Sequence, residues 1–467
     1  MVSISKLLTS AFVIGTSPTN PHPQLAIPLQ FQGDEYSAFK YFLGAGPYTT
    51  HSGYGIDPAV PSECELEQVQ LLARHGERFP SHGEGQNYEK IMDKFHNYTN
   101  AFAGPLSFLN DYEYFVPAKE LYDMETTASN SEGTFSGTND AMRHGLYFRS
   151  RYESIYNSSQ PLNVFTVNSF RVHQTADYFV RGFLGDDRSL PNWVVLSEEE
   201  DLGANSLTPK YSCSNYNHGK RNDLIGNYDS SYLKKILHRL IKDNQGLQLS
   251  TGDVDALFFW CAYETNVRGS LPFCNLFTNE EIIRHSYGND LSRYYTYGNG
   301  NNISLWASSQ LLNSSLTLLT QEDPPSNNGK IWLSFTHDTD IESFHASLGI
   351  LQPKDHLPSD QIIFPSPYQV TSVVPQHART YTEKYKCNGE SYVRYLVNDA
   401  VIPIPNCTDG PGFSCKLQDF KNYVDQRIGD ADYETMCDNQ DSGRPPKLTF
   451  YWDYPDKNYT EPLDKTY

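Results

Sequence analysis

A histidine stands between two arginines directly after a short apolar run. The stretch Arg74-His75-Gly76-Glu77-Arg78 follows residues 69–73, which have the composition of a buried strand. An arginine guanidinium is a planar fork that suits phosphate oxygens, and a histidine ring can act as a nucleophile. The pattern therefore indicates that His75 attacks a phosphoryl group held by Arg74 and Arg78.

Two further apolar runs end in polar residues of the same kind. Residues 164–167 lead into Arg171, and residues 331–335 lead into His337 and Asp338. In open α/β folds, ligands bind at the carboxyl ends of the strands. The sequence therefore predicts that these side chains gather around one phosphate.

The elements that must position these residues follow from the hydrophobic pattern. Short apolar runs predict strands, and apolar residues spaced three and four apart predict helices. The expected strands are 69–73, 162–167, 193–197 and 331–335, the expected helical regions are 87–156, 223–266 and 280–320, and a hairpin is expected from 391–397 and 400–404. Because the candidate site residues extend from 74 to 338, independent domains would separate them, which favours one discontinuous α/β unit.

These motifs resemble those of the histidine acid phosphatases, in the branch of yeast secreted acid phosphatases and fungal phytases. The matching residues are the run 74–80, Arg171-Val172 with Thr175-Ala176 and Phe179, and His337-Asp338-Thr339, and the resemblance extends from about 42–48 to 451–453. It implies a central, mixed, mostly parallel sheet flanked by helices, with a smaller inserted α-helical domain. It also implies hydrolysis of phosphomonoesters, including phytate (myo-inositol hexakisphosphate), through a phosphohistidine.

The expected roles follow from the residue types and the resemblance together. Arg74, Arg78, Arg171 and His337 hold the phosphoryl oxygens and offset the charge of the transition state. His75 is the nucleophile, and Asp338 protonates the leaving alcohol and then acts as the base toward water. The arginines supply the positive charge, so no metal or cofactor is expected.

The identity of the proton donor has alternatives nearby in the sequence. Asp340 and Glu342 follow Asp338, and in an extended segment Asp338 and Asp340 would share a direction. The family motif favours the aspartate directly after His337. We expect the three arginines to lower the pKa of His75 and a bound phosphate to raise the pKa of Asp338, so that both groups suit acid pH.

Two features of the sequence allow interpretations that compete with the assignment of His75 and Asp338. A second Arg-His-Gly, Arg143-His144-Gly145, lies in a helical pattern with Tyr147 where the first motif has an arginine, so His144 is expected to be structural. A metal-dependent hydrolase would need further ligands beside His337 and Asp338, and only Asp340 and His345 are available, without a compact ligand set. No role is assigned to Glu77.

Charge and hydropathy limit the partners. The formal net charge is −20, whereas nucleic acids require a basic surface, so a nucleic-acid partner is not expected. The charge also means that attraction of a phosphate ester must come from a local arginine pocket. No run of 18 apolar residues occurs, so no membrane span is expected. The expected partners are small-molecule phosphate monoesters, and homo-oligomerisation is left open.

Three signals indicate secretion. Residues 1–19 resemble a signal peptide with Lys6 before a short apolar stretch, and eight cysteines suit an oxidising compartment. Proximity suggests the pairs Cys261–Cys274 and Cys407–Cys415, and the family resemblance implies Cys64–Cys387 and Cys213–Cys437. Sequons for N-glycosylation occur at Asn97, Asn157, Asn302, Asn313, Asn406 and Asn458.

The expected domain is one discontinuous unit over residues 34–467. Its α/β core covers about 60–82, 160–205 and 326–467, and helical insertions cover about 83–159 and 206–325. The loop 81–87 contains no lysine, which favours simple monoesters, whereas His82 becomes cationic in acid and keeps phytate open. The alternatives are a broad-specificity acid phosphatase with little phytase activity and a catalytically inactive cell-surface glycoprotein.

Overall fold

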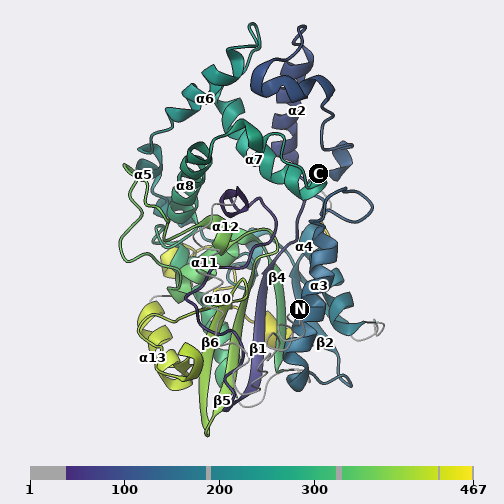
Figure 1. The fold of residues 1–467 in the computed structure, drawn as a ribbon. Helices are drawn as coiled ribbons and strands as arrows, with labels where there is room; N and C mark the ends of the chain where they lie inside the picture. Colours follow the sequence, from purple (N-terminus) through teal and green to yellow (C-terminus); the bar gives the residue numbers. More distant parts are fainter. Residues whose placement is uncertain (1–37, 186–190, 322–328, 430–431, 465–467) are drawn as a thin grey trace, which may run out of the picture.

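The chain forms one eight-stranded mixed sheet with helices around it (Figure 1). The computed structural model describes residues 38–185, 191–321, 329–429 and 432–464. The strands are β1 (Cys64–Arg74), β2 (Leu162–Val167), β3 (Pro191–Leu196), β4 (Ile331–Thr336), β5 (Arg379–Cys387), β6 (Glu390–Val397), β7 (Ala400–Ile402) and β8 (Cys415–Lys416). They lie in the order β3-β2-β4-β1-β5-β6-β7, and β8 pairs with β6.

The helices lie in the connections between the strands and, for α13 to α15, in the segment after the last strand. They are α2 (His82–His96), α3 (Gly137–Tyr152), α4 (Phe170–Leu184), α5 (Asn222–Gly226), α6 (Tyr232–Ile241), α7 (Thr251–Arg268), α8 (Asn279–Thr296), α9 (Ser304–Ala307), α10 (Ser309–Thr320), α11 (Asp338–Leu348), α12 (Val370–Val373), α13 (Leu417–Ile428), α14 (Tyr433–Cys437) and α15 (Phe450–Asp453). Capping boxes fix the first turns of α2, α7 and α8.

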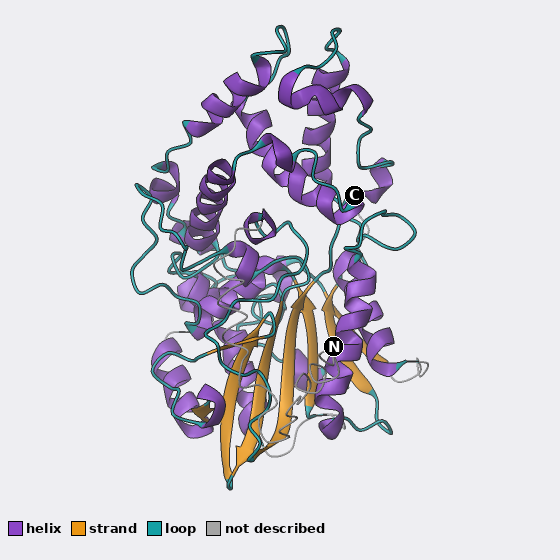
Figure 2. Cartoon of the chain, in the orientation of Figure 1, coloured by secondary structure: helices purple, strands orange, loops and turns teal. Residues whose placement is uncertain are grey.

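The parallel strands occupy one half of the sheet, and their carboxyl ends meet at one edge. Strands β3, β2, β4 and β1 are parallel neighbours, with Arg74 opposite Thr336 and Phe335 opposite Thr166. The expected α/β fold with a mixed sheet is confirmed, although its antiparallel half (β5 to β8) is larger than expected because the sequence pattern did not reveal β5. Figure 2 shows the ends of the parallel strands pointing toward a group of helices.

The two faces of the sheet bury different helices. On β4, the ring of Phe335 packs against Phe179 of α4, whereas its neighbour Ser334 bonds to Tyr451 of α15. Adjacent side chains of a strand point to opposite faces, so α4 and α15 cover opposite faces. All six residues of β2 and of β4 are buried, as expected of strands covered on both sides.

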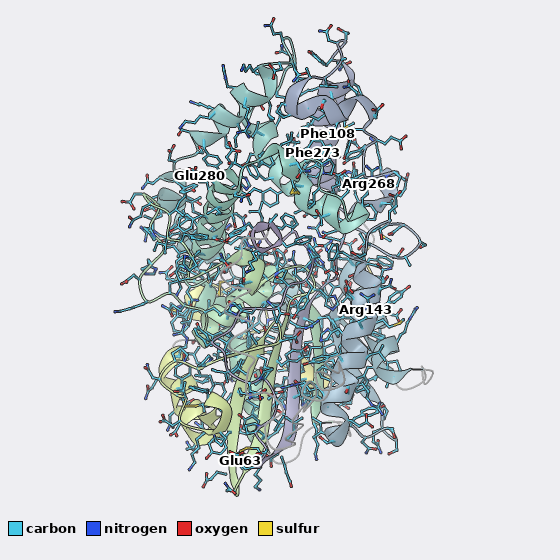
Figure 3. All side chains as sticks on the ribbon, viewed as in Figure 1. Glu63, Phe108, Arg143, Arg268, Phe273 and Glu280 are labelled. Carbon is cyan, nitrogen blue, oxygen red and sulfur yellow. A yellow bond between two sulfur atoms is a disulfide. The ribbon has the colours of Figure 1, made fainter. Side chains whose placement is uncertain are left out.

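A second hydrophobic cluster forms a helical lobe over the carboxyl ends of the strands. It combines residues of α2, α6 and α7 with the segments 104–122 and 271–277. Phe108 and Phe273 meet inside this lobe with ring centroids 5.1 Å apart (Figure 3). The helical lobe and the sheet therefore have separate hydrophobic cores.

The expected helical insertions do not coincide with the helical lobe. Phe148 and Tyr152 of α3 lie within 83–159, and Leu312 of α10 lies within 206–325, yet all three belong to the core around the sheet. Periodicity identifies a helix but does not show which core buries its apolar face.

Four disulfides cross-link the described chain, two of them between distant segments and two within short loops. The structure forms Cys64–Cys387, Cys213–Cys437, Cys261–Cys274 and Cys407–Cys415, the four expected pairs. Cys64 lies directly opposite Cys387 in the β1–β5 register, so this bridge braces the strand that ends in Arg74. The expected signal segment, 1–19, lies outside the described residues. No helix in the described part of the chain is long and apolar enough to span a membrane.

Candidate active site

His75 lies in a buried loop directly after β1, and its ring orientation is fixed. The side chain is 2% exposed, and its Nδ1 lies 2.9 Å from the carbonyl oxygen of Gly76. A carbonyl accepts but does not donate, so Nδ1 carries the proton in this bond. The lone pair of the neutral ring is therefore on Nε2, where it is available to an electrophile.

The surroundings of His75 keep the ring neutral. Its pKa lies well below the ordinary value because the ring is buried and because Arg74, Arg171, Arg78 and His337 are close enough to repel a positive charge. The expected direction of the shift agrees with the structure, but burial is a larger cause than the arginines. An unprotonated nucleophile can thus exist in acid.

Arg74 links the loop of His75 to Asp338. Its Nη1 donates to the carbonyl oxygens of Gly44 at 2.6 Å and Val374 at 2.7 Å, and its Nη2 lies 3.2 Å from Oδ2 of Asp338. Backbone carbonyls therefore hold one side of the guanidinium, and the other side faces the carboxylate of Asp338.

The other two predicted arginines also have carboxylate partners. Nη1 of Arg78 lies 3.5 Å from Oε2 of Glu84, and Nη1 of Arg171 donates to Oδ1 of Asp123 at 3.2 Å. The sequence predicted a local arginine pocket, and in the structure each of these arginines is paired with a carboxylate. The carboxylates partly neutralise the local positive charge.

His337 faces His75 and has its own acidic partner. The two rings are 5.8 Å apart between centroids. Nε2 of His337 bonds to Oε1 of Glu198, which lies two residues after the end of β3. The sequence analysis predicted the strand before Glu198 but did not identify Glu198 as a site residue. Its position as a carboxylate at the end of a fourth strand was the signal that could have identified it.

Asp338 begins helix α11, which corrects the expectation of an extended segment. At 100° per residue, Asp338 and Asp340 point in nearly opposite directions, and the residue that shares a face with Asp338 is Glu342. Asp340 is buried and ion-paired with Lys210 at 3.2 Å. Acidic residues in a first turn are a helix signal that the sequence contained.

Arg293 is the arginine that the sequence interpretation missed. It lies on α8, its Nη2 donates to Oδ2 of Asp338 at 2.8 Å, and it also pairs with Glu342. Burial alone would raise the pKa of Asp338, but Arg293 and Arg74 hold it well below its ordinary value. Without phosphate, Asp338 is therefore a carboxylate, opposite to the protonation expected when phosphate is bound. No local pattern marks Arg293, because it reaches the site only through the packing of α8.

The residues of the competing interpretations do not join this group. Nε2 of His345 bonds to the hydroxyl of Thr380 at 2.8 Å, so neither His345 nor Asp340 gathers with His337 as a metal ligand set would. Nε2 of His144 bonds to the hydroxyl of Tyr381 at 2.8 Å, away from the arginines. Its neighbour Arg143 lies on the outer part of α3 (Figure 3).

Comparison with known proteins decides the family. Residues 65–398 match the model of the histidine phosphatase superfamily (branch 2), a range that includes all six predicted catalytic and phosphate-binding residues. The chain belongs to this family. The expected family and enzyme class, a histidine phosphatase that hydrolyses phosphomonoesters, are confirmed.

Relatives cover almost the whole length of this histidine phosphatase. It is 50% identical over 467 residues to a phytase of Candida albicans, covering 99% of this chain and all of that protein. It is 40% identical over 439 residues to the constitutive acid phosphatase of Saccharomyces cerevisiae, covering 93% of each chain. The crystal structure of the phytase from D. castellii matches with a TM-score of 0.89 and 48% identity, covering 92% of this chain and 93% of that one.

Proposed function

We propose that the chain is a secreted, metal-independent acid phosphatase that hydrolyses phytate and simple phosphomonoesters through a phosphohistidine at His75. The observation that carries this proposal is the neutral His75 ring, whose Nδ1 is bound to Gly76, whose Nε2 has no hydrogen-bond partner among the described residues, and which lies close to Arg74, Arg78 and Arg171. This arrangement supplies a nucleophile and cations for the transferred group without a metal.

In the first step, Nε2 of His75 attacks phosphorus in line with the ester bond. The N–P bond forms as the bond from phosphorus to the ester oxygen breaks, and the proton of Asp338 passes to the leaving oxygen. The guanidiniums of Arg74, Arg78 and Arg171, with His337, stabilise the charge on the three remaining oxygens. The products are an alcohol and phosphorylated His75.

In the second step, water hydrolyses the intermediate. The carboxylate of Asp338 takes a proton from water as its oxygen bonds to phosphorus, and the N–P bond breaks. Inorganic phosphate leaves, and His75 returns to its neutral form. Asp338 is protonated again, ready for the next ester.

Substrate binding must change the charge state of Asp338. A bound phosphate competes for Arg74 and Arg293, which hold the ligand-free carboxylate, and adds negative charge beside it. Both effects raise the pKa of Asp338. The carboxyl thus becomes a proton donor in the complex, most completely at acid pH.

The relatives favour phytate among the substrates. Identity to the Candida albicans phytase is 50%, compared with 40% for the Saccharomyces cerevisiae acid phosphatase. Arg293 adds a fourth arginine to the three predicted ones, which suits a highly anionic ester once the paired carboxylates are protonated or displaced.

Secretion and glycosylation agree with the surface and the disulfides. The asparagines of all six sequons are exposed (Asn97, Asn157, Asn302, Asn313, Asn406 and Asn458). Four disulfides are stable in oxidising compartments and rare in the cytosol.

Phosphate release from p-nitrophenyl phosphate and from phytate, side by side at about pH 4–5 in EDTA, tests the proposal. Release from both substrates, lost in H75A, is expected. Release from p-nitrophenyl phosphate alone would support the broad-specificity alternative and remove phytate. Release from neither would support the inactive glycoprotein, and activity restored only by added metal would contradict the metal-free mechanism.

A further inference from the structure

A short segment runs alongside the loop that carries His75. We call residues 123–126 the strap. The amide of Phe79 donates to the carbonyl of Met124 at 2.9 Å, and the amide of Thr126 donates to the carbonyl of Glu77 at 2.8 Å. Arg78 and Glu125 form an antiparallel bridge. The strap therefore fixes the backbone on which the nucleophile loop is built.

The strap's two acidic side chains contact different parts of the active site. Oδ1 of Asp123 accepts from Arg171. Oε1 of Glu125 accepts from the amide of Gly76 at 2.7 Å and from the hydroxyl of Thr175. Thr175 belongs to α4, the helix that carries Arg171, and its hydroxyl oxygen lies 2.8 Å from the same Gly76 amide.

Both ends of Gly76 are engaged, and each bond bears on His75. The Gly76 amide is held by Glu125, and the Gly76 carbonyl accepts the Nδ1 proton of His75. Close packing makes this geometry depend on glycine, since a Cβ on Gly76 would lie 2.9 Å from the backbone of Gly137. The orientation of the imidazole therefore depends on the position of the Gly76 backbone.

Burial of the Glu125 carboxyl is energetically unfavourable. It is 0% exposed, and its Oε2 has no hydrogen-bond partner among the described residues. Burial raises its pKa to about 8 although Thr175 and the Gly76 amide favour the charged form, and Glu77 adds repulsion that Arg171 opposes. A buried carboxyl with an unsatisfied oxygen destabilises a fold, so its position calls for a functional explanation.

We propose that Glu125 is a positioning residue for phosphoryl transfer. It holds the Gly76 backbone so that the His75 imidazole keeps Nε2 directed at phosphorus, and through Thr175 it fixes the loop relative to the helix that carries Arg171. This inference rests on the proposed role of His75 as nucleophile. Glu125 itself does not touch the reacting atoms.

The test compares E125L, which removes the acceptor at similar volume, with E125Q, which keeps an acceptor oxygen. Because a misplacement of about 1 Å costs on the order of 100-fold in rate, E125L should lose about 100-fold in kcat with little change in KM. E125Q should recover most of that loss. Single-turnover formation of the phosphoenzyme should be the step that E125L slows.

The matched control is E264L. Glu264 is another buried carboxyl, 1% exposed, with a pKa raised by burial to about 7, and it bonds to Tyr112 in the helical lobe. E264L should lower the melting temperature and leave kcat unchanged. Equal kcat losses in E125L and E264L, or an E125Q as slow as E125L, would overturn the proposal.

A milder variant covers the case in which E125L does not fold. T175V removes one of the two acceptors of the Gly76 amide and should lower kcat by about tenfold, the scale of one hydrogen bond. T265V removes a buried hydroxyl that bonds within α7 and should leave kcat unchanged. Unchanged kcat in T175V would overturn the proposal. Failure of the underlying mechanism has a different signature, namely phosphoenzyme formation in H75A.

Discussion

The tripeptide Arg-His-Gly occurs twice in this histidine phosphatase, at 74–76 and at 143–145, in two different environments. Both histidines are buried, and burial lowers the pKa of each well below the ordinary value. His75 lies directly after β1, and among the described residues only its Nδ1 has a hydrogen-bond partner. In His144, in the middle of α3, both ring nitrogens have neighbours, with Nε2 bound to Tyr381 and Nδ1 3.3 Å from His377.

The difference shows what burial and the motif do not provide. A neutral imidazole is common to both copies, but only His75 has Arg74, Arg78 and Arg171 around it, whereas the arginine that lowers the pKa of His144 is Arg379. His144 instead lines a cavity of about 530 Å³ that contains none of the predicted phosphate-binding residues. The strand before the motif and Arg78 after it therefore carry the functional information.

Replacing the two histidines tests this comparison with the largest effect. H75A should lower kcat by about 10⁴-fold or more, because it removes the nucleophile. H144A should leave kcat near that of the wild type and reduce the free energy of unfolding by about 1–3 kcal/mol, because Tyr381 loses a buried partner. Steady-state kinetics and thermal denaturation measure both. Equal losses of kcat would contradict the assignment.

The carboxyls after His337 provide the next contrast. D338N should slow hydrolysis of alkyl phosphates by about 10²–10⁴-fold through loss of the general acid. The loss should be smaller for p-nitrophenyl phosphate, whose leaving group needs no proton. D340N should lower the melting temperature, because Lys210 loses its buried partner, and leave this leaving-group dependence unchanged. A D338N loss that is independent of the leaving group would rule out proton donation.

Replacing the arginine in each Arg-His-Gly motif should also have different effects on kcat. The loss expected at Arg74 is similar to or smaller than the loss expected for D338N. R74Q removes a cation beside the transferred group and should lower kcat by about 10²–10³-fold. The Arg143 side chain is 70% exposed and pairs with Asp140 on the same helix, so R143Q should change neither kcat nor stability measurably. An R143Q enzyme with a raised KM for phytate would show that α3 contributes to substrate binding.

The smallest expected effect is on stability between about pH 6.5 and 8.5, where both histidines are neutral in the folded chain and at most half protonated in the unfolded chain. Burial raises the pKa of Glu125 to about 8 and those of Glu77 and Glu264 to about 7. These groups are still protonated in the folded state at pH values at which they are ionised in the unfolded state, so the free energy of unfolding falls as pH rises toward each folded pKa, by about 1.4 kcal/mol per group for each pH unit below it, and levels off above it.

Melting temperatures at these two pH values check the sign. E264Q should show a smaller decrease than the wild type, because it lacks one of the three carboxyls. Below pH 6.5 the sign for the histidines reverses: they are neutral when folded and bind protons when unfolded, which destabilises the fold as pH falls. H144A should therefore lose less stability than the wild type in acid. A melting temperature that rises above pH 6.5 would contradict the assigned protonation states.

The sequence predicted the parts of the site that depend on neighbouring residues. Apolar runs before Arg74, Arg171 and His337 identified three strand ends, and parallel pairing brings those ends to one edge. The same reasoning missed β5, whose alternating polar residues Thr380 and Thr382 are nevertheless buried. Burial of both faces of that strand is a property of the tertiary structure and leaves no apolar run.

The missing parts of the site come from segments that approach through packing. Arg293 reaches Asp338 from α8, and Glu125 reaches Gly76 from the strap. Neither residue lies near a motif in the sequence. Arg293 lowers the pKa of Asp338, and Glu125 accepts a hydrogen bond from the amide of Gly76, and both of these partners belong to motifs. The sequence therefore identified residues that the structure brings together, whereas it did not reveal the protonation of Asp338 in the ligand-free site.

Trapping of the covalent intermediate tests the central claim most directly. The enzyme is mixed with radiolabelled substrate at acid pH, quenched in alkaline denaturant within a turnover, and mapped by peptide. The account predicts one alkali-stable phosphohistidine, on the peptide that contains His75, present in H144A and absent in H75A. Label on another residue, or turnover by H75A through the same intermediate, would contradict it.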